Sequence, residues 1–84
     1  MRYQARVTLH APAEEVRKRP YLWGAVAAID EHTCEYRTND DSLDWLALRI
    51  AMLGIAFDVH EPPELVEAFR ALAQRCARAA GGGE

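Results

Sequence analysis

The sequence predicts an α+β fold, a ferredoxin-like βαββαβ sandwich with one additional helix at the C-terminus. Three segments alternate between apolar and polar residues, which is typical of half-buried strands, a fourth strand-like segment is apolar at nearly every position, and three segments show helical periodicity. These segments follow one another in the order βαββαβα. Right-handed crossovers in both βαβ units then give a four-stranded antiparallel sheet with strand order 4-1-3-2 and both crossover helices on one face.

The first half of the chain predicts a strand, a short helix and a hairpin. Alternation begins at the N-terminus, and Pro12 suits the first turn of a helix that Pro20 ends. Acidic residues at the start of this helix and basic residues at its end complement the helix dipole. The expected elements are a strand at 2–10 with Tyr3, Ala5, Val7 and Leu9 on its apolar side, strands at 23–29 and 34–38, and a polar turn at 30–33 between them.

The second half predicts a helix, the fourth strand at 55–60 and a final helix that begins at a Pro-Pro pair. Asp41 is expected to cap the first of these helices, with Asp44 in the acidic variant of the capping box. Gly54 then ends the helix, because glycine is free to adopt a positive φ. The expected core residues of the two helices are Leu43, Leu46, Ala47, Ile50 and Leu53 in the first and Leu65, Ala68, Phe69, Leu72, Ala73 and Cys76 in the second.

Length and composition indicate one small domain, expected over residues 1–80, with a disordered tail at 81–84. The chain has 84 residues, of which 50% are hydrophobic, and a formal net charge of −3. This charge argues against a free-standing binder of duplex DNA, which needs a basic surface to displace counterions from the phosphates. The sequence shows neither an N-terminal signal nor an apolar segment long enough to span a bilayer. We therefore expect a cytoplasmic protein that does not enter the membrane.

No cofactor, metal or enzymatic activity is expected from the residues. The three histidines are far apart and have no cysteine or carboxylate at ligand spacing. Cys34 and Cys76 lack the pattern of a disulfide scaffold or a zinc site, and each falls at a core position of its element. We find no catalytic motif.

The stretch DDSLDWLALRIAMLG at 40–54, followed directly by IAFDVHEPPELVEAFRALAQRCARA at 55–79, resembles the C-terminal extension (WCX) domain of bacterial WYL-domain transcriptional regulators. The similarity runs from Ala5-Arg6-Val7 to the region of Ala80. Its specificity lies in the combination of a capped helix, a Leu-Gly stop, Phe-Asp-Val-His-Glu-Pro-Pro-Glu-Leu and a final Leu-Ala-x-x-Cys-Ala helix.

The resemblance implies a non-enzymatic regulatory module at the end of a longer transcription factor. In such regulators a winged helix-turn-helix binds DNA and a WYL domain senses an effector, and single-stranded nucleic acid is the effector class of some members. The resemblance further implies a homodimer in the full-length regulator and contacts with its WYL domain. It carries over no binding residue, because the effector-binding residues of the family lie chiefly in the WYL domain.

The first helix of the second half has more apolar surface than one sheet can cover. Beside its core stripe lie Trp45, Leu48, Arg49 and Met52, so this helix is apolar over more than half of its circumference. We expect the last helix to fold back over Trp45 and Met52 within the monomer. The alternative is an interface with a second copy or another domain, since tryptophan and arginine are favoured anchors at interfaces.

The open face of the sheet carries two arginines on neighbouring strands, Arg6 and Arg37. Together they could bind a phosphate or carboxylate through bidentate hydrogen bonds. The interpretation that we favour is a solvated face with ion pairs, Arg37 with Glu35 or Arg6 with Asp58. Tyr36, the aromatic residue nearest to this face, is expected to point inward, which argues against an RNA-stacking platform.

Two other functional classes share the predicted fold. An ACT-like module binds a small ligand at a subunit interface, but its glycine-containing loop after the first strand is absent here. An acylphosphatase-type enzyme needs a phosphate-cradling loop with an arginine, which residues 11–15 cannot supply. A regulatory domain is therefore the main prediction, with the ACT-like module as its alternative.

Overall fold

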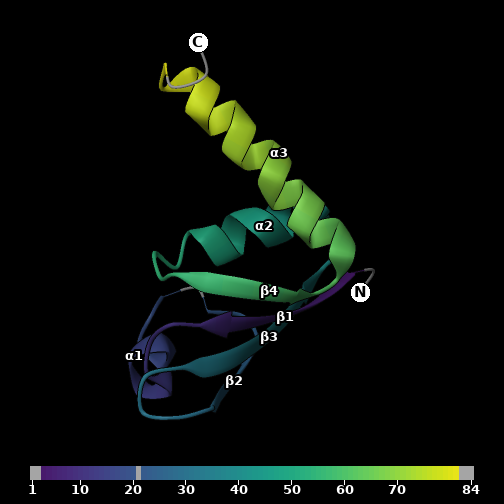
Figure 1. The fold of residues 1–84 in the computed structure, drawn as a ribbon. Coiled ribbons are helices and arrows are strands. Elements are labelled where there is room, and N and C mark those ends of the chain that lie inside the picture. Colours follow the sequence, from purple (N-terminus) through teal and green to yellow (C-terminus); the bar gives the residue numbers. More distant parts are fainter. Residues whose placement is uncertain (1–2, 21, 82–84) are drawn as a thin grey trace.

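The computed structural model describes residues 3–20 and 22–81 and shows a four-stranded sheet with helices on one face (Figure 1). All neighbouring strands are antiparallel, and the order β2-β3-β1-β4 is the predicted order 4-1-3-2 seen from the other edge. The elements are β1 (Tyr3–Leu9), α1 (Ala13–Arg17), β2 (Ala25–Ala28), β3 (Cys34–Asp40), α2 (Leu43–Ala51), β4 (Phe57–Glu61) and α3 (Pro63–Ala79). The predicted fold class is confirmed. Of the expected tail, residues 82–84 lie outside the described residues.

The hydrophobic core lies between the sheet and the two crossover helices. β1 and β3 each turn alternate residues toward the helices, and Val7 lies opposite Tyr36 in the register of the two strands. Tyr36 therefore points inward, as predicted. The other buried apolar residues are Ala5, Leu9, Ala11, Ala13, Val16, Cys34, Leu46, Ala47, Ile50, Leu53 and Leu65.

The start of α2 differs from the sequence prediction by one residue. Ser42, not Asp41, is the N-cap: its backbone is extended, and its hydroxyl accepts a hydrogen bond from the Trp45 backbone N–H at 3.2 Å. The neighbouring carboxylate of Asp40 accepts from the Ser42 N–H at 3.0 Å. Both residue types are good caps, so the sequence alone could not place the helix start between them. Gly54 has the positive φ that was predicted, +69°, but the helix ends earlier than predicted, at Ala51 with Met52 as its C-cap.

The second strand is shorter than predicted. Residues 23–29 were expected to form it, but β2 covers only Ala25–Ala28 at the edge of the sheet. Trp23 and Ile29 lie just outside its two ends, and both are more than half exposed. An edge strand has only one neighbour to pair with, so the chain leaves the ladder early and Trp23 becomes part of the adjoining surface.

Helix α3 packs on the body only through its first half (Figure 1). Leu65 is buried, and the Phe69 ring lies 4.9 Å from that of Phe57 on β4. Every residue from 73 to 81 is exposed, which gives the molecule extents of 40 × 27 × 22 Å. The prediction that Cys76 lies in the core is therefore wrong. The apolar periodicity of the helix continues beyond the point where the small body ends.

Candidate interaction groove

An open, mostly apolar groove lies between α2 and the segment that follows α1. Its volume is about 600 Å³. The α2 side contributes Trp45, Arg49 and Met52, and Trp23 stands on the opposite side, before β2. Arg19, Pro20, Asp40 and Leu53 complete the lining. The groove therefore lies where the two crossover helices leave the helical face of the sheet incompletely covered.

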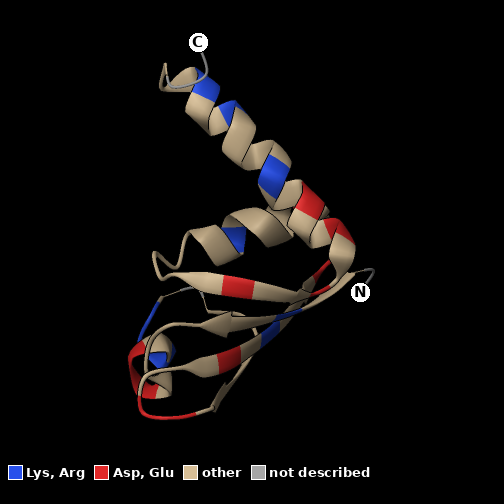
Figure 2. Cartoon of the chain, viewed as in Figure 1, with Lys and Arg blue, Asp and Glu red and all other residues tan. Residues whose placement is uncertain are grey.

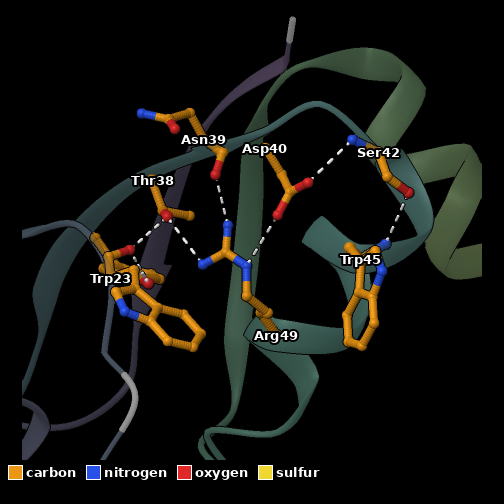
Figure 3. A network of polar contacts seen from close by, with 8 residues as sticks. Trp23, Thr38, Asn39, Asp40, Ser42, Trp45 and Arg49 are labelled. Atoms are coloured by element: carbon orange, nitrogen blue, oxygen red, sulfur yellow. Dashed lines mark hydrogen bonds and ion pairs between the residues drawn. The ribbon is translucent and has the colours of Figure 1, made fainter. Parts of the chain in front are cut away.

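Arg49 is the centre of the polar network beside this groove (Figure 3). Its side chain is only 12% exposed. Each of its three nitrogens donates one hydrogen bond: Nε to the Asp40 carboxylate at 3.2 Å, Nη1 to the Thr38 hydroxyl at 3.2 Å and Nη2 to the Asn39 carbonyl at 2.6 Å. One guanidinium thus ties α2 to the end of β3, which its planar fork geometry allows and an ammonium group would not.

The charge of Asp40 is stabilised in this network. Its pKa is held below the ordinary aspartate value by the backbone N–H of Ser42 first, and by the charge and hydrogen bond of Arg49. Partial burial of the carboxylate opposes this shift. The residue is therefore an ionised partner for Arg49, and it also fixes the loop that leads into α2.

Trp23 is held in place by hydrogen bonds to its backbone carbonyl and by a contact of its ring with Arg49. The Trp23 carbonyl accepts hydrogen bonds from the Tyr36 hydroxyl at 2.6 Å and from the Thr38 hydroxyl. The guanidinium carbon of Arg49 lies 5.7 Å from the centre of the Trp23 ring, within the range of a cation–π contact. Gly24 permits the close approach of this segment to β3, because a Cβ there would lie 2.3 Å from the Arg37 carbonyl oxygen.

The structure brings the predicted interface residues together on one side of α2. Trp45 and Met52 are 59% and 68% exposed, and Leu48 is exposed beside them. The expectation that the last helix covers Trp45 and Met52 is wrong, because α3 packs against another side of α2 and then leaves the body. Arg49 differs from the other three in being largely buried.

Trp23 is a groove residue that sequence reasoning placed in a strand. It is 57% exposed and faces the groove opposite Trp45, with Arg49 between the two rings (Figure 3). The continuous apolar run from residue 22 to residue 29 concealed it, because such a run is also typical of a buried strand. The proline and glycine that flank Trp23, at positions 20 and 24, were the available signal of a break.

Arg6 and Arg37, the predicted anion contacts, are engaged with carboxylates on the open face of the sheet. Arg6 Nε donates to Glu61 at 2.8 Å and Arg37 Nε donates to Glu35 at 2.8 Å. The Nη1 atom of Arg6 also lies 3.7 Å from Glu35. These contacts lower the pKa of both glutamates, chiefly through the hydrogen bonds from Arg37 to Glu35 and from Arg6 to Glu61.

One of the two predicted ion pairs on this face is wrong. Arg6 was expected to pair with Asp58, but the register between β1 and β4 shifts at Arg6, which places Glu61 opposite it. Asp58 instead contacts His10 at 2.7 Å. The expected pair of Arg37 with Glu35 is present. This face is therefore a set of matched polar contacts, with charges of both signs along the strands in Figure 2.

Comparison with protein families adds an independent observation to this geometry. The model of the WCX domain family matches residues 1–77 of the 84. The chain belongs to the WCX domain family. A comparison with curated proteins and one with solved structures give no significant match.

Within this WCX domain, the other candidate chemical groups are dispersed. Among the described residues no group of three histidine, cysteine or carboxylate side chains could hold a metal ion. Cys34 is buried as predicted, and burial raises the pKa of its thiol, whereas Cys76 is exposed on α3. No helix in the described part of the chain is both long and apolar enough to cross a membrane.

Proposed function

We propose that this WCX domain is a non-enzymatic regulatory domain at the C-terminus of a WYL-family transcriptional regulator in the cytoplasm. In that regulator a winged-helix domain binds DNA, a WYL domain receives an effector, and the WCX domain helps to couple the two. Membership of the WCX family supports this assignment. The acidic net charge of the domain fits a role in which DNA is bound elsewhere in the regulator.

The observation that carries the proposal is the exposed apolar surface that α2 and its C-cap form together with Trp23 across the groove. Trp23, Trp45, Leu48 and Met52 are four of the five large hydrophobic side chains that are exposed among the described residues. Exposed apolar side chains gathered in one place mark interaction sites, and tryptophan is enriched among the residues that contribute most to interface affinity. We propose that this face docks on the WYL domain and supports the homodimer of the regulator.

The ACT-like alternative has less support. Its ligand would lie beside the connection after β1, which here consists of His10, Ala11 and Pro12. The groove lies instead beside α2, so a ligand site in this chain would differ from that of an ACT module.

The test is the molar mass of the 84-residue chain over a concentration series, measured by light scattering after size exclusion. We expect a concentration-dependent dimer, and we expect Trp45→Ala combined with Met52→Ala to raise its dissociation constant at least about tenfold. Ile29→Ala is the control, because Ile29 is also more than half exposed but lies just beyond the far end of β2.

Two outcomes would count against parts of this proposal. If both variants dimerise like the wild-type chain, another surface mediates association, and the edge strand β4 becomes the next candidate. If the wild-type chain is monomeric at every concentration, self-association through this domain is wrong. The same two variants, made in the longer regulator, then test docking on the WYL domain.

A further inference from the structure

The groove has the size and walls of a small-molecule site. Its volume of about 600 Å³ lies within the range of 300–1,000 Å³ that is typical of ligand pockets. Two indole rings stand on either side of the Arg49 side chain (Figure 3), and Met52, Leu53 and Pro20 extend the apolar surface. Rings arranged in this way can stack against a flat apolar body, whose burial is favourable in proportion to its area.

The groove also contains positive charge that the protein has not neutralised. Arg19 lines it and has no ion-pair partner among residues 3–20 and 22–81. Arg49 has five N–H groups, of which three donate to Asp40, Thr38 and Asn39, so two remain for a further acceptor. Among the described residues that line the groove, Asp40 is the only one with a carboxylate, and this carboxylate is already bound by Arg49 and by the Ser42 N–H.

Taken together, these features select for one class of ligand. Arg19 and Arg49 would repel a cation. A polar ligand would not bury the apolar surface of the two indole rings and Met52. A molecule with a flat apolar body and one anionic group matches both the walls and the charge, because guanidinium groups bind carboxylates through strong, directed hydrogen bonds. We propose that the groove between Trp23 and Trp45 binds a small aromatic or similarly flat carboxylate.

This inference goes beyond the proposed regulatory function, which requires only that the groove face contacts protein. A ligand in the groove would occupy the surface around Trp45 and Met52, so its binding and the docking of a partner would oppose each other by linkage. Ligand binding and self-association are measured separately, and either can fail without the other.

The two tryptophans make the groove directly observable. They are the only tryptophans in the chain, and both line the groove. The two indole N–H signals in a ¹⁵N–¹H NMR spectrum of the 84-residue chain therefore report on this site alone. The probes are 4-phenylbutanoate and its neutral amide, 4-phenylbutanamide, each titrated at a protein concentration below that of any self-association. We expect both indole signals to shift and the carboxylate to bind about tenfold more tightly than the amide.

Three variants connect this preference to named residues. Arg19→Gln should reduce the preference for the carboxylate to about threefold or less, and Trp45→Ala should weaken both probes. Lys18→Gln is the matched control, because it removes the same charge from the adjacent residue, which is exposed and does not line the groove. Circular dichroism and thermal melting of each variant show whether it is folded.

The proposal is overturned if the carboxylate and the amide bind equally, or if Lys18→Gln has the same effect as Arg19→Gln. It is also overturned if the indole signals do not respond to either probe. Indole signals that respond to protein concentration instead would show that a second copy fills the groove, which supports the proposed docking face and excludes the ligand.

Discussion

The open face of the sheet and the groove beside α2 both contain arginines, but the two regions use them differently. On the sheet, Arg6 and Arg37 form ion pairs with Glu61 and Glu35, and in each pair one side chain, Glu61 or Arg37, is at least 60% exposed. At the groove, Arg49 is largely buried and organises backbone and side chains from β3, while Arg19 has no ion-pair partner among the described residues. On the sheet face both arginines have carboxylate partners, whereas the groove has exposed apolar surface and an arginine, Arg19, without such a partner among the described residues.

This difference separates residues that look equivalent in the sequence. An exposed ion pair contributes little to stability, because water and salt screen the charges and the long side chains lose entropy when they are held. A largely buried guanidinium with three directed hydrogen bonds contributes more, and removing it leaves Asp40 without its cation. We therefore expect substitutions around the groove to change stability more than substitutions on the sheet face.

The largest effect is expected at Gly24, which sets the position of the Trp23 wall. Its φ is +146°, and a Cβ would lie 2.3 Å from the Arg37 carbonyl oxygen and 2.8 Å from the Tyr36 ring. Because a backbone oxygen cannot move aside cheaply, Gly24→Ala should lower the free energy of unfolding by about 3 kcal/mol. Urea denaturation of the purified chain measures this change.

Gly54→Ala is the control for this substitution. Gly54 also has a positive φ, but a Cβ there meets nothing within 4 Å. We expect a loss of about 1 kcal/mol, which is the cost of the left-handed conformation alone. Equal losses for the two variants would mean that the close approach at Gly24 does not hold the groove wall in place.

The next effect compares the two kinds of arginine directly. Arg49→Met removes three hydrogen bonds and the partner of Asp40, and we expect it to destabilise the chain by about 2 kcal/mol. Arg37→Met removes one exposed ion pair and should change stability by less than about 0.5 kcal/mol. Urea denaturation of both variants in the same buffer gives the comparison, and a larger loss for Arg37→Met would contradict it.

Most of the core could be predicted from the sequence, because one-dimensional periodicity determines it. The alternation in β1 and the α2 stripe around Leu46 and Ile50 mark the residues that the structure buries. The sequence also predicted the excess apolar surface on α2 and the residues that carry it, such as Trp45. It could not predict whether α3 covers that surface, because this depends on the direction in which α3 leaves the body.

The other differences between prediction and structure arise from how the strands and helices are arranged relative to one another. A shift of register between β1 and β4 exchanged Asp58 for Glu61 as the partner of Arg6, and no feature of a single strand encodes such a shift. Trp23 joined the groove because β2 ends early at the sheet edge. The groove itself combines residues from four segments, so only the assembled fold could reveal it.

The smallest predicted effect concerns acid, and it compares Asp40 with Glu61. The pKa of each carboxyl is lower in the folded chain than its ordinary value, so the folded state binds fewer protons than the unfolded state as pH falls. Each group therefore contributes stability that is present above its unfolded pKa, near 3.8 for Asp40 and 4.5 for Glu61. This contribution is lost as the pH falls through the lower folded value.

Asp40→Asn and Glu61→Gln test how much each carboxylate contributes to the pH dependence of stability. In either variant the difference between the urea midpoints at about pH 6 and at about pH 3 should be smaller than in the wild-type chain. The reduction should be greater for Asp40→Asn, because the Asp40 side chain is 27% exposed and that of Glu61 is 60% exposed. Added salt should weaken the Glu61 contribution first, since its pairing with Arg6 is open to solvent. If salt instead removes the Asp40 contribution and spares that of Glu61, the groove network is the more solvated of the two, and the contrast between the regions is wrong.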